Sequence, residues 1–158
     1  MEKQPISMAG FKQLQERLRQ LKEVERPDIL AAVQKARELG DLSENADYKT
    51  AKDQQRNIDS EIRRLESIAN GANIVDVDSL SGDRVMFGAS VVLEDEDGKE
   101  VRYKILSEYE TDLSKNIIGH SSPLARALIG RSMGDTCLVR TPAGEKEYEI
   151  KDVKYGRD

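Results

Sequence analysis

The sequence predicts an α+β protein: an N-terminal antiparallel two-helix coiled coil over residues 1–75, then a small antiparallel-sheet domain with one short helix over residues 76–158. Two observations predict this division. Apolar residues recur at helical spacing up to about residue 70, and after "NGANIVD" they alternate as in strands. With 37% hydrophobic residues, two Phe and no Trp, each part should have a modest core.

Two helical segments make up the first part. In the second segment the apolar positions advance alternately by three and four residues, as in a coiled-coil seam. Those positions are Tyr48, Ala51, Gln55, Ile58, Ile62, Leu65 and Ala69. The first segment has one irregular step, beside Pro27, and its positions are Leu14, Leu18, Leu21, Glu25, Ile29, Ala32, Ala36 and Leu39. Taken in opposite directions the two sets match, which predicts a hairpin about 45 Å long that turns near residue 41. A dimerising coiled coil is the alternative that heptads alone allow.

The second part predicts two β-hairpins with a helix between them. The segment "ASVVLEDEDGKEVRYKIL" alternates on both sides of Asp97-Gly98, and "TCLVRTPAGEKEYEIKDV" does so around Pro142-Ala143-Gly144. Between them, in "SSPLARALIG", Ser122 can cap a helix, Pro123 suits its first position and Gly130 can end it.

Charge and composition exclude several classes of function. The net charge is −5, and residues 1–75 carry 13 basic and 13 acidic side chains. The whole excess of acidic over basic residues therefore lies in the second part. A protein that binds duplex DNA alone should present a basic domain, so we expect no independent duplex affinity. The single residues Cys137 and His120 disfavour a zinc cluster, a disulfide or a triad, although one His could still act as a base. No apolar run suits a signal peptide or a membrane span, so a cytoplasmic protein is expected.

The stretch "LGDLSENADY", residues 39–48, lies at the expected turn of the hairpin. Asp41 and Glu44 have capping-box spacing directly after Gly40, with Asp41 as the N-cap of the second helix. The same carboxylates could also hold Mg²⁺, which is often bound by one or two carboxylates together with groups of a partner or substrate. Two acids on an exposed tip make no tight site alone, but they could complete a metal site in another protein.

Basic residues lie on both sides of the tip acids in the expected hairpin. Arg37, Lys49 and Lys52 lie within two turns of the tip and are candidates to meet phosphates. Arg56, further along, is equally explained as a solvated charge that pairs with neighbouring acids. The interleaved aromatic residues of a single-strand binder are absent.

Together, "ARELGDLSENADY", "SSPLARALIG" and "TPAGE" closely resemble the bacterial transcript-cleavage factors of the Gre family, and the resemblance covers essentially the whole chain. It implies a coiled coil that enters the secondary channel of RNA polymerase and brings Asp41 and Glu44 to the catalytic centre. There they would help to hold a second Mg²⁺, shared with the polymerase, and stimulate the polymerase's own cleavage of backtracked nascent RNA near its 3′ end. Asn45 and Tyr48 match tip positions and receive a supporting role.

The resemblance also implies an FKBP-like second domain that docks on the rim of the channel, with Ser122, Pro123 and Arg126 as candidate contacts. A capped helix alone would explain these three residues equally well. The equal numbers of basic and acidic residues in the coiled coil favour a GreA-like member without excluding a GreB-like one. The small number of basic residues along it predicts a preference for short backtracks. We expect a monomer with no membrane partner and no tightly bound metal, which hydrolyses nothing alone and is therefore not itself an enzyme.

Three other functions stay open at this point. An FKBP-like domain could be a prolyl isomerase, but that chemistry needs an apolar aromatic pocket, and residues 76–158 contain one Phe and four Tyr. The chain could block the channel without stimulating cleavage. It could also be a coiled-coil scaffold or holdase, whose function would survive loss of the tip acids.

Overall fold

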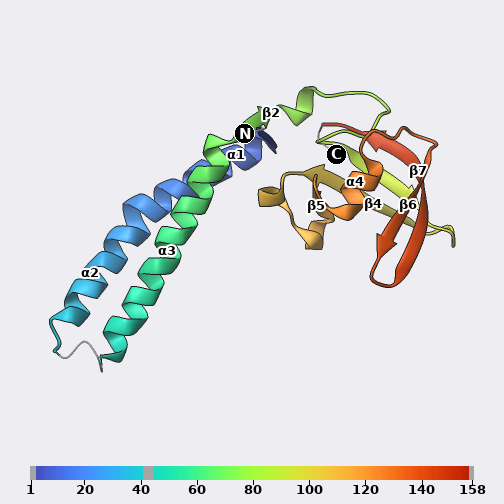
Figure 1. Cartoon of the computed structure of the whole chain (residues 1–158). Coiled ribbons are helices and arrows are strands. Elements are labelled where there is room, and N and C mark those ends of the chain that lie inside the picture. The colour runs from blue at the N-terminus through green and yellow to red at the C-terminus, as the bar shows by residue number, and fades with distance from the viewer. Residues whose placement is uncertain (1–2, 41–44, 157–158) are drawn as a thin grey trace. The chain divides into compact units, whose positions relative to one another are not determined.

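The computed structural model describes residues 3–40 and 45–156, so Asp41 and Glu44 lie outside the described residues. The chain divides into two compact units: Phe11–Ala72 forms the first, and Lys3–Gly10 joins the residues from 73 onward in the second. The sequence pattern placed residues 1–75 together, whereas the contacts assign Lys3–Gly10 to the second unit. A helical hairpin and a sheet domain are both present, which confirms the predicted α+β class (Figure 1).

The first unit is an antiparallel helical hairpin (Figure 1). Its first side consists of α1 (Met8–Gln20), the π-helical segment η1 (Leu21–Glu25) and α2 (Arg26–Arg37), and its second side is α3 (Ala46–Asn70). The seam is buried where aliphatic side chains of the two sides meet. Its buried members are Leu14, Leu21, Ile29, Val33, Ala36, Ala51, Ile62 and Leu65.

The π-helical segment explains the irregular step of the first helix. In η1 the amide of Arg26 bonds to the carbonyl of Leu21, five residues back, immediately before Pro27. Proline has no amide hydrogen and its ring crowds the carbonyl four residues earlier, so the wider turn accommodates it. Relative to an unbroken heptad, one added residue moves each later seam position forward by one. Ile29 and Ala36 are buried as predicted, but Val33 is buried in place of Ala32, and the predicted seam positions Ala32 and Leu39 are wrong because both are exposed.

An ion-pair group joins the π-helical segment to the facing helix. The Arg17 guanidinium donates to both carboxylate oxygens of Glu61, at 2.9 and 3.0 Å, and also to Glu25. The hydrogen bonds from Arg17 lower the pKa of Glu61. These side chains are about one-third exposed, so the group fixes the pairing of the two sides more than it stabilises the fold.

The second unit contains a five-stranded sheet in the order β5-β4-β3-β7-β6. Its strands are β3 (Ser90–Glu94), β4 (Glu100–Leu106), β5 (Ile117–Gly119), β6 (Thr136–Thr141) and β7 (Gly144–Lys154). The pairs β3–β4 and β6–β7 are antiparallel, which confirms both predicted hairpins. The short β5 runs parallel to β4, a departure from the expected purely antiparallel sheet.

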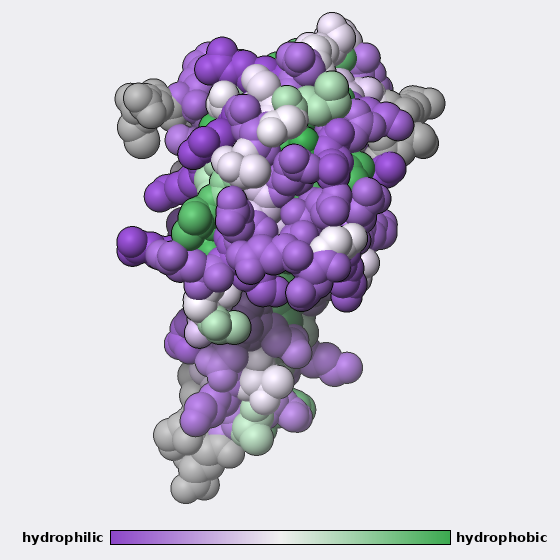
Figure 2. Space-filling model, turned by 90° about the vertical axis from the view of Figure 1, so that its right-hand side faces the viewer, coloured by the Kyte–Doolittle hydropathy of each residue, from purple (hydrophilic) through white to green (hydrophobic). Residues whose placement is uncertain are grey.

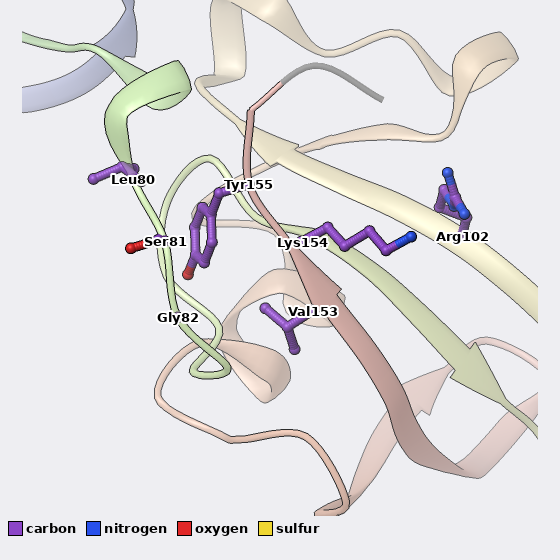
Figure 3. A pocket seen from close by; sticks show the side chains of 7 residues that line it. All are labelled: Leu80, Ser81, Gly82, Arg102, Val153, Lys154 and Tyr155. Atoms are coloured by element: carbon purple, nitrogen blue, oxygen red, sulfur yellow. The ribbon is translucent and has the colours of Figure 1, made fainter.

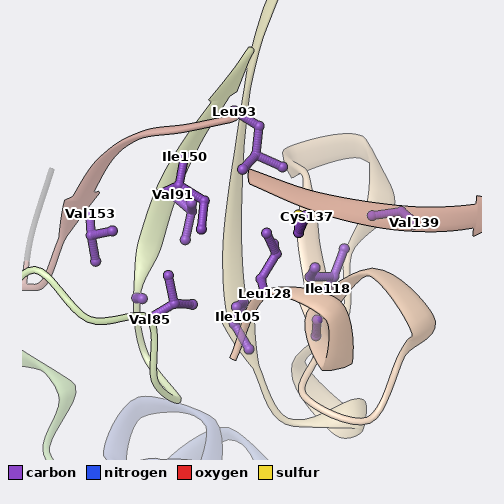
Figure 4. Close-up of a cluster of buried hydrophobic side chains, with 12 residues drawn as sticks. Val85, Val91, Leu93, Ile105, Ile118, Leu128, Cys137, Val139, Ile150 and Val153 are labelled. Carbon is purple, nitrogen blue, oxygen red and sulfur yellow. The ribbon is translucent and has the colours of Figure 1, made fainter. Parts of the chain in front are cut away.

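The core of the second unit lies between the sheet and helix α4 (Pro123–Leu128), as Figure 4 shows. Alternate residues of β3, such as Val91 and Leu93, point into this core. Ala125 and Leu128 enter it from α4. Cys137 of β6 is also buried there, with 4% of its surface exposed, and burial raises the pKa of its thiol.

A carboxylate anchors the start of α1 within the second unit. Strand β1 (Gln4–Ser7) forms a two-stranded sheet with β2 (Ala72–Val75). The amide and hydroxyl of Ser7 donate to Glu110, and the Ser7 hydroxyl accepts from the Gly10 amide at 3.0 Å. Glu110 also accepts from the amide and hydroxyl of Ser107. A Cβ atom at Gly10 would lie 2.2 Å from the Glu110 carboxylate, so a side chain at this position would displace that carboxylate.

Hydrophilic residues cover most of the face seen in Figure 2, and hydrophobic residues occur on it in small separate groups. Among the helices of the described ranges, none has the length and apolar character needed to cross a membrane.

Candidate functional site

The described residues of the hairpin tip are the last turn of α2 and the first turn of α3. Helix α2 ends at Arg37, after which the amide of Leu39 bonds to the carbonyl of Ala36 at 3.1 Å. Gly40 then adopts a φ of +125°, a conformation that side chains rarely permit. Gly40 therefore lies one residue beyond the position where a helix-ending glycine is most often found.

Asn45 is the residue that starts α3. Its side-chain oxygen accepts a hydrogen bond from the Tyr48 amide at 3.0 Å, the usual geometry of an N-cap. Its side-chain nitrogen donates to the Ala36 carbonyl at 2.7 Å. One side chain thus joins both helices at the tip.

This arrangement corrects the predicted cap. Asp41 was expected to be the N-cap of the second helix and Glu44 its third residue, but α3 begins at Ala46 with Asn45 as its N-cap. The capping-box spacing of Asp41 and Glu44 gave a wrong N-cap because "ENAD" contains a second capping residue, Asn45, directly after Glu44. Asn45, rather than Asp41, is thus the N-cap of the helix that the structure describes.

The predicted basic residues do not all behave alike. The Arg37 guanidinium lies over the Tyr48 ring, 5.8 Å from its centroid, which is cation–π geometry. Lys52 donates to Gln55 at 3.2 Å, and Arg56 pairs with Asp53 at 2.8 Å within the same helix. Lys49 is exposed in the first turns of α3. Arg56 therefore fits the solvated-charge explanation, whereas Arg37 and Lys49 stay close to the tip.

No metal site is formed by the residues that the structure describes: within them, no three His, Cys, Asp or Glu side chains come together as possible ligands. The two acids assigned to Mg²⁺, Asp41 and Glu44, are outside those residues. Near them in the chain, Glu38 and Asp47 are exposed.

The candidate docking residues lie in the second unit, at the start of α4. The Ser122 hydroxyl accepts from the Ala125 amide at 3.3 Å, and Pro123 occupies the first helical position. Arg126 is exposed one turn later. The predicted helix and its cap are confirmed, while the docking role stays a prediction.

Glu108 holds the loop before α4. This carboxylate accepts from the Ser121 amide at 3.0 Å and from the Ser121 hydroxyl. These bonds, with smaller contributions from His120 and Arg126, lower the pKa of Glu108 despite partial burial. A Cβ atom at Gly119 would lie 2.1 Å from the same carboxylate. This group has no signal in the sequence, because a lone Glu and a Gly 11 positions apart form no recognisable motif.

His120, left open as a possible base, belongs to the same loop. Its Nε2 atom lies 3.1 Å from Oε1 of Gln4, and its ring meets the edge of Phe87 with centroids 6.0 Å apart. Its Nδ1 atom is buried without a hydrogen-bond partner among the described residues. These contacts give His120 a packing role in the second unit.

A pocket of about 450 Å³ opens on the second unit (Figure 3), and none of the described residues that line it was predicted as a site residue. It is lined by Leu80, Ser81, Gly82, Arg102, Val153, Lys154 and Tyr155. The Tyr155 hydroxyl is already used, since it donates to the Arg84 carbonyl and accepts from the Met86 amide. Lys154 lies 3.7 Å from Asp152. The pocket is polar and Tyr155 is the single aromatic residue among those that line it, whereas a prolyl isomerase needs an apolar aromatic pocket.

Comparisons with known proteins identify the class to which this fold and tip belong. Residues 4–74 match the family model "Transcription elongation factor, N-terminal", and residues 80–155 match "Transcription elongation factor, GreA/GreB, C-term". The chain belongs to the GreA/GreB family of transcription elongation factors.

Individual relatives agree with this family. The chain is 49% identical to transcription elongation factor GreA of Anaeromyxobacter sp. (strain K), over 98% of this chain and 94% of that one. It is 47% identical to GreA of Rickettsia canadensis, over 96% and 94%. Among solved structures it is similar to GreA factor homolog 1 of Thermus thermophilus, with 25% identity, coverage of 98% and 99%, and a TM-score of 0.46.

Proposed function

We propose that this chain binds bacterial RNA polymerase and stimulates the polymerase's own cleavage of backtracked nascent RNA, which rescues arrested complexes. The observation that carries the proposal is family membership along the whole chain: both family models match, and GreA relatives are 47–49% identical over nearly its full length. A helical hairpin that carries "LGDLSENADY" between its two sides supports the assignment of the tip.

In this proposal the hairpin enters the secondary channel and presents Asp41 and Glu44 at the catalytic centre. Both are carboxylates, and carboxylate oxygens are ligands that suit Mg²⁺, so the donor set fits the metal. The Mg²⁺, shared with the polymerase, would supply an activated water for hydrolysis of the phosphodiester. The factor alone should hydrolyse nothing, because two carboxylates leave most of the metal's coordination to other groups.

The remaining assigned residues support these acids. Asn45 and Tyr48 shape the tip, and Arg37 and Lys49 are the better placed of the basic residues to meet the RNA 3′ end. Lys52 and Arg56 are engaged within α3 and contribute less. Ser122, Pro123 and Arg126 contact the rim of the channel in the FKBP-like domain. The factor acts as a cytoplasmic monomer.

The test is RNA cleavage in a stalled, backtracked elongation complex with Mg²⁺. Asp41→Ala and Glu44→Ala should each lower the stimulated rate at least about tenfold, since each removes a metal ligand, while polymerase binding stays near that of the wild type. Asp53→Ala, which removes an exposed acid further along α3, is the matched control and should cleave normally.

Circular dichroism checks that every variant keeps its helices. A wild-type factor that binds polymerase without releasing 3′ fragments would replace this proposal with that of a channel-blocking regulator. Full stimulation by both acid variants would instead overturn the assignment of Asp41 and Glu44 as metal ligands.

A further inference from the structure

We propose that the pocket on the second unit (Figure 3) binds a nucleoside diphosphate. The phosphates of this ligand contact Arg102 and Lys154, and its base stacks on the ring of Tyr155. The proposal goes beyond the function proposed above and does not depend on it, because every lining residue that the structure describes belongs to the second unit.

Two cationic side chains form one side of the pocket. Arg102 comes from β4 and Lys154 from β7, and both are exposed. In β3, which lies between these strands, Val92 is in register with Arg102. Ser90, two residues earlier, is in register with Lys154. Since residues opposite each other or two apart share a face of a sheet, both cations lie on one face. Figure 3 shows the Lys154 side chain extended toward Arg102.

This positive charge contrasts with the rest of the domain. Residues 76–158 carry 12 of the 25 basic and 17 of the 30 acidic side chains. A third cation, Lys104, lies on the same face, because it is in register with Ser90 on the side opposite Lys154. Such a group of cations attracts an anion, and an arginine side chain can donate two parallel hydrogen bonds to a phosphate.

The acids of this face leave much of that charge available. Asp152 lies 3.7 Å from the Lys154 ammonium, which is longer than a direct hydrogen bond, and its carboxylate also accepts from the Val153 amide at 3.0 Å. Further along the same strands, Glu94 and Glu149 both pair with Lys151, at 3.1 and 2.7 Å. An incoming phosphate therefore competes with one long ion pair at Lys154.

A fixed aromatic ring forms another side of the pocket. Tyr155 is half-buried, and its hydroxyl donates to the Arg84 carbonyl and accepts from the Met86 amide at 2.9 Å. In Figure 3 the ring lies between Leu80 and the Lys154 side chain. Bases stack on aromatic side chains of any sequence context, since every base has a π-face. The ring can therefore receive a base whose phosphates point toward the cations.

The size and the two kinds of lining together indicate the ligand class. The pocket volume of about 450 Å³ falls within the range of small-molecule sites, roughly 300–1,000 Å³. Ser81 adds an exposed hydroxyl, which can donate to or accept from a ribose hydroxyl. An inorganic anion would use the cationic side alone, and an uncharged ring compound the aromatic side alone. A nucleoside diphosphate uses both.

The first measurement titrates the full-length protein with ADP and follows the backbone amide resonances of Gly82 and Tyr155 by NMR. Binding should saturate with a Kd on the order of 1 mM or tighter, which is the affinity expected of an open site. Pyrophosphate and adenosine should each bind at least about tenfold more weakly, because each lacks the contacts of one side.

Variants then test the individual contacts. Arg102→Gln and Lys154→Gln should each weaken ADP binding about three- to tenfold, since each removes a charged hydrogen-bond donor. Asp152→Asn should strengthen it about two- to fivefold, because it removes the competing charge and keeps an acceptor for the Val153 amide. Lys146→Gln removes an exposed cation of the same strand outside the pocket and should bind as the wild type does. Urea unfolding checks that each variant is folded.

The outcomes bear on the pocket alone, because polymerase is absent from these measurements. Unmoved Gly82 and Tyr155 resonances at about 10 mM ADP, tenfold above the expected Kd, would overturn the proposal. Pyrophosphate that binds as tightly as ADP would overturn the nucleoside assignment. Equal losses in Lys154→Gln and Lys146→Gln would show general attraction of an anion to the protein surface and would overturn the site.

Discussion

Glu108 shows how a single carboxylate can shape a loop by excluding side chains as well as by bonding. Its Oε1 atom accepts from both the amide and the hydroxyl of Ser121, and the carboxylate occupies the space that a Cβ atom at Gly119 would need. The loop leads directly into Ser122 and Pro123, the capped start of α4. The geometry of the candidate docking segment therefore depends on a residue that lies outside it.

The lowered pKa of Glu108 makes its contribution depend on pH. A carboxyl whose pKa is lower in the folded protein stabilises it above the ordinary value, here 4.5, and that stabilisation disappears as the pH falls through the folded-state pKa. Glu108→Gln should therefore unfold at a lower urea concentration than the wild type at pH 7. The gap should narrow below about pH 4.5 and close at pH values where Glu108 is protonated.

Urea unfolding at pH 7 and at pH 3 checks this expectation, since the other carboxyl groups titrate equally in both proteins. Glu96→Gln removes an exposed acid from the β3–β4 turn and serves as the control for the loss of one charge. A gap that is as wide at pH 3 as at pH 7 would show that the charge of Glu108 is not what holds the loop.

At the scale of elements, the π-helical segment sets which residues of α2 face α3. The one-residue insertion before Pro27 puts Val33, with 6% of its surface exposed, into the seam. Val24 lies within the inserted turn and is 45% exposed. The two valines belong to one side of the hairpin but occupy opposite environments.

Val33→Ala should destabilise the hairpin by about 1–3 kcal/mol, since it removes buried methyl groups and leaves a cavity beside Ile29 and Ala51. Val24→Ala should change the free energy of unfolding by less than about 0.5 kcal/mol. Thermal and urea unfolding followed by helical circular dichroism measure both. Equal effects of the two substitutions would contradict the shifted register.

The elements differed in how well the sequence predicted them, for physical reasons. Long periodic segments, such as α3 and the β3–β4 hairpin, were predicted because their burial repeats over many residues. The three-residue strand β5 was not, since three apolar residues carry no period. At the tip, two residues of the sequence could cap the second helix, and the hydrogen bond from Asn45 to the Ala36 carbonyl, which the sequence alone does not reveal, accompanies its position as the N-cap.

For the whole molecule, the chain order and the compact units do not coincide. Residues Lys3–Gly10, which include the first turn of α1, lie at the start of the sequence yet belong with the sheet domain. Ser7 is buried there, with 3% of its surface exposed, and its hydroxyl both donates to Glu110 and caps α1. The second unit is therefore assembled from both ends of the chain.

Ser7→Ala should destabilise the second unit by about 1–3 kcal/mol, because it leaves the part-buried Glu110 short of a donor and removes a helix cap. Amide hydrogen exchange should increase in β4 and its neighbour β3, whereas the α3 amides around Ala51 should keep their rates. Ser60→Ala, at an exposed helical position, is the control. Faster exchange confined to α3 would assign Ser7 to the hairpin instead.

The burial of Cys137 has a practical consequence for experiments on this protein. It is the only cysteine of the chain, it is 4% exposed, and its thiol has a raised pKa, so it offers little reactive thiolate to an alkylating reagent. A cysteine introduced on the exposed face of the hairpin, for example at Thr50, would then be the one reactive thiol of the native protein. A fluorophore or spin label can be attached there without first removing the native cysteine.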